Sequence, residues 1–497
     1  MTMTIEKLIE FCKPISVSGI TPDTLGKLRQ DSRAIKKNDI FIAVKGTKSD
    51  GHDFIEDAIQ RGAVLIISEK EIQTNNNTAV LVVKNTRKLL GPLAQFMVNN
   101  PAEKIKIIGV TGTNGKTTVA TLVWQILTRL GHPASLLGTV EKRINQKVVQ
   151  STLTTADPIE LADDIKQIYD AGSTHLVMEV SSHALHQHRV DGIHFDLAVF
   201  TNLTHDHLDY HTSMQEYATA KKMLFNGLTD QSWAITNADD SRGEWMVNST
   251  PAKVLSISFE GKGLINAKLL RSGAEGMKIS VDDAEINTPL VGTFNAYNVV
   301  QALLTCTCLG LDGKKVSEAI KECKGAPGRL ERVTSADDIG KLPLVLVDYA
   351  HTPNALENVL SALSGLKSKK QKLAVVFGCG GDRDRSKRPK MAAISQTYAD
   401  EIFVTSDNPR SENPDAIIDD IMKGFSNPES VQRISSREQA IRTAILKADH
   451  KTIVLIAGKG HETYQEINGK RNHFDDREEA RNALGEKNGH SNSMEVA

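Results

Sequence analysis

The clearest chemical signal is a glycine-rich loop, TGTNGKTT, between a β-like run at residues 104–110 and an amphipathic helical pattern at 119–130. In such a loop, backbone N–H groups and the start of the following helix surround phosphate oxygens. Lys116 would reach the outer phosphates, and the Thr117 hydroxyl would bind Mg²⁺. The strict phosphate-loop motif has glycine where this chain has Val110, so the loop is a variant. An ordinary strand-to-helix turn is the alternative interpretation.

Histidines are concentrated in one segment, because seven of the 15 fall between residues 183 and 211. Glu179 and one or two of these histidines could hold a divalent ion beside the phosphates, since Mg²⁺ takes one or two protein ligands together with phosphate and water. A zinc site at His205, His207 and His211 is an alternative. Most of the seven are expected to be ordinary core or loop residues.

Four apolar runs in the C-terminal third each lead into a polar loop rich in glycine or proline: residues 344–348, 373–377, 402–405 and 453–457. Ligands of doubly wound sheets bind at the carboxyl ends of such strands, so the loops predict a site. Asp348 closes the first run. It could contact a metal or phosphate, as a Walker-B carboxylate does, or simply cap the turn.

Basic residues near these motifs have two interpretations each. Arg388 and Arg410 lie in strand-end loops, where a guanidinium suits a carboxylate or phosphate, and a solvated surface arginine is the alternative. Lys221 and Lys222 lie in a helical pattern, where pattern alone predicts solvated side chains.

The elements that position these residues follow an α/β pattern. Strand-like runs at 39–45, 63–68 and 79–83 enclose a helix-like segment that Gly62 ends, and further runs at 175–180 and 196–201 alternate with helical segments. This alternation predicts mostly parallel sheets.

Composition sets the class of protein. The 497 residues suggest about three domains. A net charge of −1, from 60 Lys and Arg against 61 Asp and Glu, argues against a nucleic-acid-coating protein. No apolar run is long enough to span a membrane. The five cysteines have no C-x-x-C spacing, which fits a reducing compartment. We expect a cytoplasmic protein that binds neither nucleic acid nor membrane.

The predicted division has three domains. Residues 1–98 form a small N-terminal α/β domain, residues 99–331 a central phosphate-loop domain with a mostly parallel sheet, and residues 332–497 a C-terminal Rossmann-like domain. The tail at 485–497 is expected to be disordered.

Many blocks together resemble the Mur ligases. They are TGTNGKTT, LTT (153–155), EVSSHALHQHR (179–189), TNLTHDHLDYH (201–211), YATAKKMLF, GTFNAYN (292–298), GAPGRLERV, VDYAHTP, FGCGGDRDRSKRP and AGKGHETYQ. They extend from the Asp31-Ser32-Arg33 unit to Glu462. The resemblance implies an ATP-dependent amide ligase whose three domains bind a UDP substrate, ATP and an amino acid. In this family the substrate carboxylate attacks ATP, and the resulting acyl phosphate is attacked by the amine.

The resemblance also implies residue roles. Residues implied to contact ATP are Gly112, Thr113, Asn114, Gly115, Lys116, Thr117, Thr118, Asn295, Arg329 and Asp348. Those implied to hold Mg²⁺ are Thr117, Glu179, His207 and Lys221, where Lys221 matches the lysine that the family carbamylates to an anion. The catalytic set is Lys116, Glu179, His207 and Lys221. Ser32 would contact the UDP part, and the sugar-peptide contacts would be Thr154, Thr155, Ser181, Gln187 and Arg189.

Amino-acid choice is implied by the DNPR block, Asp407, Asn408, Pro409 and Arg410, which resembles the signature of members that add meso-diaminopimelate. Diaminopimelate carries one more carboxylate than lysine, and a guanidinium can bind it bidentately. Arg388, Gly458 and Glu462 match the rest of that pocket.

The expected partners are UDP-N-acetylmuramoyl-L-Ala-D-Glu, meso-diaminopimelate and ATP, bound by a monomer. Three alternatives stay open: the same ligase using L-lysine, a ligase similar to folylpolyglutamate synthetase, and a phosphate-loop NTPase that acts as a switch without ligation.

Overall fold

The computed structural model describes residues 4–46, 49–74, 78–145, 147–282, 284–368 and 370–495, with side chains up to residue 489. The chain forms two compact units. The first consists of residues 1–116, 131–236 and 240–255, and the second of residues 117–130, 237–239 and 256–497. The predicted boundaries of three domains stay a prediction.

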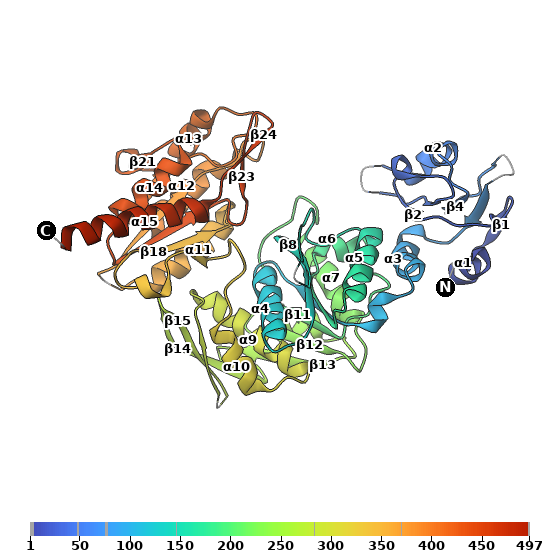
Figure 1. The fold of residues 1–497 in the computed structure, drawn as a ribbon, viewed down its shortest axis with the longest axis horizontal. Helices are drawn as coiled ribbons and strands as arrows, with labels where there is room; N and C mark the ends of the chain where they lie inside the picture. Colours follow the sequence, from blue (N-terminus) through green and yellow to red (C-terminus); the bar gives the residue numbers. More distant parts are fainter. Residues whose placement is uncertain are drawn as a thin grey trace. The chain divides into compact units, whose positions relative to one another are not determined.

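The N-terminal part of the first unit is a five-stranded sheet in the order β1-β5-β4-β3-β2 (Figure 1). Only the β1–β5 pair is antiparallel. Ile40 and Ile42 pack towards α1 and α3, whereas Phe41 packs towards α2, because successive strand side chains point to opposite faces. The elements are α1 (Ile5–Cys12), β1 (Ser16–Ser18), β2 (Leu28–Arg29), η1 (Ser32–Ala34), β3 (Ile40–Ile42), η2 (Gly51–Phe54), α2 (Ile55–Gln60), β4 (Leu65–Ser68), β5 (Ala79–Val82) and α3 (Thr86–Met97).

A second sheet of this unit has the order β12-β11-β6-β10-β7-β8-β9. The pairs from β12 to β7 are parallel, and β7, β8 and β9 form antiparallel hairpins. Apolar side chains of α5 and α7 cover one face of this sheet. The elements are η3 (Pro101–Lys104), β6 (Lys106–Thr111), β7 (Ala134–Leu137), β8 (Glu141–Ile144), β9 (Lys147–Gln150), α5 (Pro158–Asp170), β10 (His175–Glu179), α6 (Ser182–His186), β11 (Leu197–Phe200), α7 (Met214–Asn226), β12 (Trp233–Asn237) and α8 (Gly243–Val247).

Along the sequence, the second unit begins at Thr117, in the helix that follows the phosphate loop. This helix, α4, begins at Lys116, three residues before the predicted 119–130 pattern, and ends at Arg129. Strands β14, β15 and β16 form an antiparallel meander. The elements of this part are α4 (Lys116–Arg129), β13 (Lys253–Ser258), which begins in the first unit, β14 (Ile265–Gly273), β15 (Gly276–Val281), β16 (Ala284–Thr288), α9 (Thr293–Cys308) and α10 (Gly313–Lys321).

The C-terminal part of the second unit is a three-layer α/β/α structure around a sheet in the order β17-β18-β22-β19-β20-β21 (Figure 1). Leu346 and Val375 pack towards α11, α12 and α13, while Val345 and Val376 pack towards α14 and α15. All four predicted apolar runs are parallel strands of this sheet. The elements are β17 (Glu331–Arg332), η4 (Ala336–Asp338), β18 (Leu344–Asp348), α11 (Pro353–Leu366), β19 (Lys372–Phe377), α12 (Lys387–Tyr398), β20 (Glu401–Val404), α13 (Pro414–Met422), η5 (Pro428–Ser430), β21 (Gln432–Arg433), α14 (Arg437–Lys447), β22 (Thr452–Ala457), β23 (Tyr464–Ile467), β24 (Lys470–His473) and α15 (Asp476–Glu495).

The tail from Gly485, which the sequence predicts to be disordered, continues α15 as far as Glu495. Leu484 is buried, and Arg442 of α14 donates from Nε to Glu486 at 2.8 Å. Lys487 donates to the carbonyl of Leu446 at 2.8 Å. These contacts with α14 supply the packing that the polar composition of the tail does not suggest. Residues 496 and 497 lie outside the described residues.

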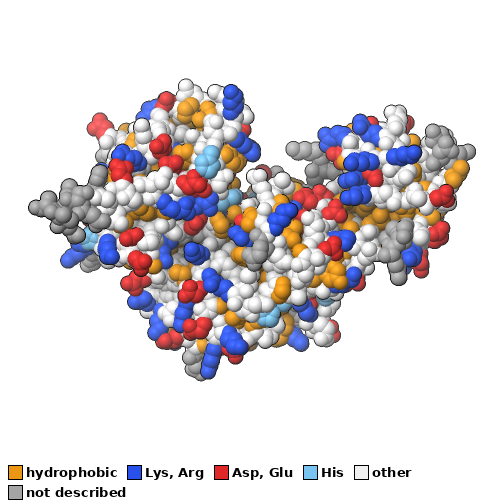
Figure 2. Space-filling model, in the orientation of Figure 1, with side chains coloured by type: hydrophobic (Ala, Val, Ile, Leu, Met, Phe, Trp, Pro, Cys, Tyr) orange, Lys and Arg blue, Asp and Glu red, His pale blue; other side chains and the backbone are white. Residues whose placement is uncertain are grey.

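Charged side chains of both signs alternate over the face that Figure 2 shows, in agreement with the net charge of −1. Within the described ranges, no helix is both long and apolar enough to cross a membrane.

Candidate active site

The phosphate loop follows β6 and has a backbone that only glycine adopts easily. Gly112 has φ +151°, and a Cβ there would clash with Oγ1 of Thr201. Asn202, just after β11, holds the loop: its carbonyl accepts from the N–H of Thr113 at 2.8 Å, and its Oδ1 accepts from the N–H of Asn114 at 2.9 Å. The Nζ of Lys116 donates to the carbonyls of Gly112 and Thr113 at 3.0 and 2.8 Å. The loop is therefore a cradle of backbone groups with a cation at its base, which fits a phosphate chain.

Lys221 is the second cation at this loop. It is 1% exposed on α7, and its Nζ donates to the carbonyl of Gly112 at 2.7 Å. Burial, and then the charge of Lys116, lower the pKa of Lys221 well below its ordinary value. Lys222 is also buried, with Nζ donating to the carbonyl of Trp245 at 2.6 Å. The prediction of solvated lysines is wrong for both, because α7 packs between the phosphate loop and α8.

Glu179 ends β10 and is 1% exposed. Its carboxylate accepts from the N–H and the Oγ1 of Thr139, at 2.8 and 3.0 Å. These bonds fix the direction of the carboxylate, and a carboxylate oxygen is the ligand that Mg²⁺ prefers. The sequence does not single out Thr139. It lies beside Glu179 because the strand β7, which precedes it, pairs with β10.

The histidine-rich segment forms an aromatic cluster. The ring of His183 lies 4.1 Å from that of Tyr210 and 5.0 Å from that of His207, measured between centroids. Burial and the neighbouring His207 lower the pKa of His183 to about 4, and burial also lowers the pKa of His207 and of His211. Their rings are thus neutral near pH 7. Among the described residues, no three His, Cys, Asp or Glu gather as a metal site, so the zinc alternative gains no support.

Four of the five residues predicted to contact the sugar-peptide lie in one hydrogen-bonded network beside Glu179. Oγ1 of Thr155 donates to the carbonyl of Glu179 at 2.9 Å and accepts from the N–H of Ser181 at 3.1 Å. Arg189 donates to the carbonyl of Thr155 at 3.0 Å and to Oε1 of Gln187 at 2.7 Å.

The fifth predicted sugar-peptide residue is Thr154, and the residue predicted to contact the UDP part is Ser32. The hydroxyl of Thr154 lies 3.0 Å from Oγ1 of Thr139, which joins it to the same network. Ser32, predicted to contact the UDP part, lies in η1 of the N-terminal sheet region and is 5% exposed. Its hydroxyl donates to Asp57, whose pKa this bond lowers.

Asn295, Arg329 and Asp348, predicted to contact the nucleotide, belong to the second unit. Asp348 accepts from the N–H groups of Leu330 and Ala350 at 2.7 and 2.8 Å. The bond with Ala350 caps the turn after β18, as the simpler interpretation predicts, and the bond with Leu330 ties Asp348 to the segment before β17. Burial raises its pKa, while Arg329 and these N–H groups act in the opposite direction. Asn295 is buried and donates to the carbonyl of Val291 at 2.8 Å.

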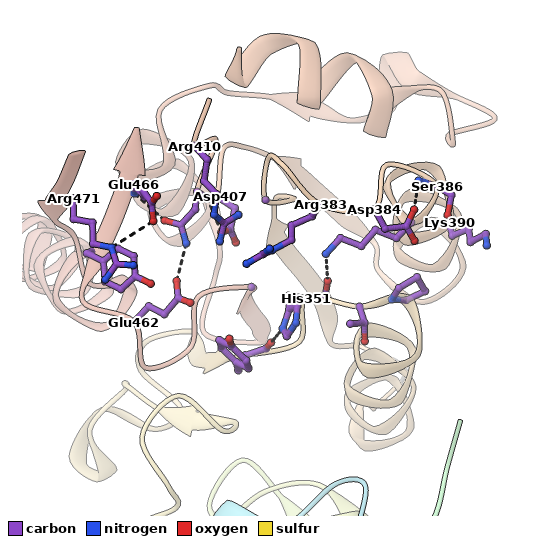
Figure 3. Close-up of a pocket in the computed structure, with 18 residues that line it drawn as sticks. His351, Arg383, Asp384, Ser386, Lys390, Asp407, Arg410, Glu462, Glu466 and Arg471 are labelled. Atoms are coloured by element: carbon purple, nitrogen blue, oxygen red, sulfur yellow. Dashed lines mark hydrogen bonds and ion pairs between the residues drawn. The ribbon is translucent and has the colours of Figure 1, made fainter. Parts of the chain in front are cut away.

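A cavity of about 810 Å³ opens at the carboxyl ends of β18, β19, β20 and β22, where the sequence predicts a site (Figure 3). Asp407, Asn408, Arg410, Gly458 and Glu462 line it, as predicted, whereas Pro409 does not. His351, Arg383, Lys387 and Glu466 line it as well.

Arg410 is held in an unusual backbone conformation, with φ +51°. Its N–H donates to the carbonyl of Glu466 at 3.0 Å, and its carbonyl accepts from the N–H of Asn468 at 2.7 Å. Its Nη1 donates to the carbonyl of Gly381 at 2.8 Å. A Cβ on Gly381 would clash with the carbonyl oxygen of Pro409, so glycine is needed for this close approach.

The assignment of Arg388 to this pocket is wrong. Arg388 is 1% exposed on α12, and its guanidinium pairs with Glu412 at 2.9 Å and Asp420 at 3.0 Å. Arg383, in the loop before α12, projects into the cavity instead (Figure 3). The sequence signal for Arg383 was its place ahead of the helix, since a loop residue at a strand end can face the ligand whereas helix α12 directs Arg388 towards α13.

Comparisons with known proteins match most of the chain. Residues 27–97 match the Mur ligase family catalytic domain, residues 110–306 the Mur ligase middle domain, and residues 328–460 the Mur ligase glutamate ligase domain. A relative from Cytophaga hutchinsonii, the UDP-N-acetylmuramoyl-L-alanyl-D-glutamate–2,6-diaminopimelate ligase, is 43% identical over 479 residues, which cover 96% of this chain and 98% of the relative. The chain belongs to the Mur ligase family. It is therefore an ATP-dependent amide ligase.

Solved structures agree with this membership. A UDP-N-acetylmuramoyl-L-alanyl-D-glutamate–2,6-diaminopimelate ligase has a TM-score of 0.72 and 32% identity, covering 98% of this Mur ligase and 100% of that chain. A folylpolyglutamate synthase of Mycobacterium tuberculosis has a TM-score of 0.57 and 20% identity, covering 76% of this chain and 92% of that one, and shares the fold.

Replacing Arg388 of this Mur ligase with alanine is expected to reduce stability rather than to remove substrate binding. Loss of the buried guanidinium removes its charged hydrogen bonds to Glu412 and Asp420, which keep only their pairs with Arg385 and Lys423, at a cost of about 2 kcal/mol. Denaturant unfolding measures this loss. The KM for the amino acid should rise much more in Arg383→Ala than in Arg388→Ala, and the opposite order would restore Arg388 to the pocket.

Proposed function

We propose that this Mur ligase joins meso-diaminopimelate to the D-glutamate carboxylate of UDP-N-acetylmuramoyl-L-alanyl-D-glutamate, with ATP, as a monomer in cytoplasmic peptidoglycan precursor synthesis. The charged side chains of the cavity support this choice of amino acid, because the cavity is lined by Arg383, Arg410 and Glu462. Diaminopimelate has two carboxylates and two ammonium groups, and a guanidinium binds a carboxylate through two parallel hydrogen bonds. Two arginines and an acidic partner suit that pattern better than they suit lysine, which has one carboxylate.

The reaction has two steps. In the first, an oxygen of the D-glutamate carboxylate bonds to the γ-phosphorus of ATP and ADP leaves, which gives an acyl phosphate. In the second, the amine of diaminopimelate bonds to the acyl carbon, a tetrahedral intermediate forms, and phosphate leaves as the amide is completed. Phosphoryl transfer depends on positioning and charge stabilisation, which the loop N–H groups and Lys116 would supply.

Mg²⁺, when bound, would stabilise the negative charge on the phosphate oxygens. We assign Thr117, Glu179 and His207 to Mg²⁺, and carbamylated Lys221 to a second Mg²⁺. The donor chemistry supports the assignment, since Glu179 is a buried, oriented carboxylate and the lowered pKa of His207 keeps its ring neutral, as a metal ligand must be.

The remaining residues are assigned to the substrates. We assign Asn295, Arg329 and Asp348 to the nucleotide, and Ser32 to the UDP group. The network around Glu179 supports a common role for its members at the sugar-peptide: Thr154, Thr155, Ser181, Gln187 and Arg189.

Phosphate release tests the proposal. The purified chain is given ATP and UDP-N-acetylmuramoyl-L-Ala-D-Glu with diaminopimelate, with lysine, or with neither amino acid. We expect release that needs both substrates and is much faster with diaminopimelate. Equal rates with lysine would overturn the choice of amino acid, and release without any amino acid would favour an NTPase switch. Release with a folate and glutamate alone would favour a folylpolyglutamate-type ligase.

A further inference from the structure

Lys459 lies behind the amino-acid cavity without lining it. The residue follows Gly458 at the end of β22 and is 0% exposed. Its Nζ lies 3.1 Å from Oδ1 of Asn408 and 3.2 Å from Oε2 of Glu462. A fully buried ammonium is costly unless it is paired and hydrogen-bonded, and these two contacts, with the Tyr464 ring 5.4 Å from Nζ, meet that need.

The two contacts determine which way the Asn408 amide faces. Oδ1 of Asn408 also accepts from the N–H of Glu466, at 3.0 Å. An ammonium and a backbone N–H can only donate, so the oxygen of the amide must face both of them. The NH₂ group of Asn408 is thereby directed to Oε2 of Glu462, to which it donates at 2.8 Å (Figure 3).

Glu462 is oriented by the same arrangement. Its Oε2 accepts from both Asn408 and Lys459, whereas its Oε1 takes no hydrogen bond from the described part of the chain. Glu462 lines the cavity, so Oε1 is the oxygen that a bound ammonium would meet. Without Lys459, Oδ1 of Asn408 would lose one of its two donors, and the carboxylate of Glu462 would lose its charged partner.

We propose that Lys459 is a positioning residue for the amino-acid pocket, which fixes Asn408 and Glu462 so that Glu462 receives an ammonium group of the incoming diamino acid. This inference rests on the proposed function. Lys459 acts through Glu462 and does not itself touch the substrate. The other interpretation is a buried lysine that serves stability alone.

The test is steady-state kinetics of Lys459→Met, which keeps an unbranched side chain one atom shorter and removes the charge. We expect the KM for diaminopimelate to rise at least about tenfold, the size expected when a charged hydrogen bond is lost, while the KM for ATP stays within about twofold. Lys470→Met is the matched control, because Lys470 is an exposed lysine on β24, and its kinetics should equal those of the unaltered chain.

A double-mutant cycle with Glu462→Gln separates positioning from stability. If Lys459 acts through Glu462, adding Lys459→Met to Glu462→Gln should change the KM for diaminopimelate by less than about twofold. A full tenfold rise when Lys459→Met is added to Glu462→Gln, or no rise in the single variant, would overturn the inference. If Lys459→Met does not fold, Lys459→Arg replaces it under the same criteria. The larger guanidinium would displace Asn408 and Glu462 from their positions around the fully buried Nζ. Failure of the proposed function is distinct, because the unaltered chain would then show no diaminopimelate-dependent phosphate release.

Discussion

Replacing Arg410 with lysine is expected to lower kcat/KM for meso-diaminopimelate by roughly 100-fold, the size of a lost pair of charged hydrogen bonds. Lysine keeps the positive charge but lacks the planar fork that binds a carboxylate at two points. It also loses the bond from Nη1 to the carbonyl of Gly381 that fixes the direction of the side chain. The loss should appear in the KM for diaminopimelate, measured by phosphate release at saturating ATP.

The KM for ATP should remain within about twofold of its original value, because the hydrogen bonds of Arg410 with the described residues join it to the C-terminal sheet region. Arg433→Lys is the matched control. Arg433 is half-exposed on β21 and pairs with Asp415 and Asp419, so exchange of its guanidinium should leave the kinetics unchanged. Unchanged use of diaminopimelate by Arg410→Lys would remove Arg410 from substrate recognition.

Local patterns predicted the strands and the strand-end loops well, because they depend on short-range periodicity. The run at 344–348 is β18 residue for residue, and the loops after β18, β19, β20 and β22 meet at one cavity. Parallel strands bring their carboxyl ends to one edge of the sheet, so the predicted strand order is enough to place these loops together.

The failures depend on contacts that no local pattern contains. Lys221 and Lys222 looked like solvated helix residues, and only the packing of α7 beside the phosphate loop and α8 buries them. Arg383 and Arg388 lie in one short segment, and the start of α12 decides which of them faces the cavity. Arg388 instead forms ion pairs with Glu412 and Asp420, which lie further along the chain. The left-handed backbone of Arg410 likewise follows from its bonds with the β23–β24 hairpin.

Replacing Lys221 with alanine is expected to abolish turnover, with partial recovery when a small carboxylate such as acetate is added. The lowered pKa of Lys221 means that its amine is neutral at lower pH than an ordinary lysine, and only a neutral amine can add to CO₂. Addition forms an N–C bond and releases a proton, which leaves a carbamate anion beside the phosphate loop. A free carboxylate could occupy the space left by the alanine and restore that negative charge. The measurement is phosphate release with and without acetate, together with the intact mass of the chain, which carbamylation raises.

Lys222→Ala is the matched control for this prediction. Lys222 is the neighbouring buried lysine, but its ammonium contacts Trp245 and Asn248 instead of the phosphate loop. Both variants lose a buried lysine on α7, so loss of stability should be similar and can be followed by thermal unfolding. Only Lys221→Ala should lose turnover at a temperature where both variants are folded, and only its activity should return with acetate. Normal turnover of Lys221→Ala would show that the reaction needs no anion at this position, and the role of Lys221 would then be limited to its bond with the carbonyl of Gly112.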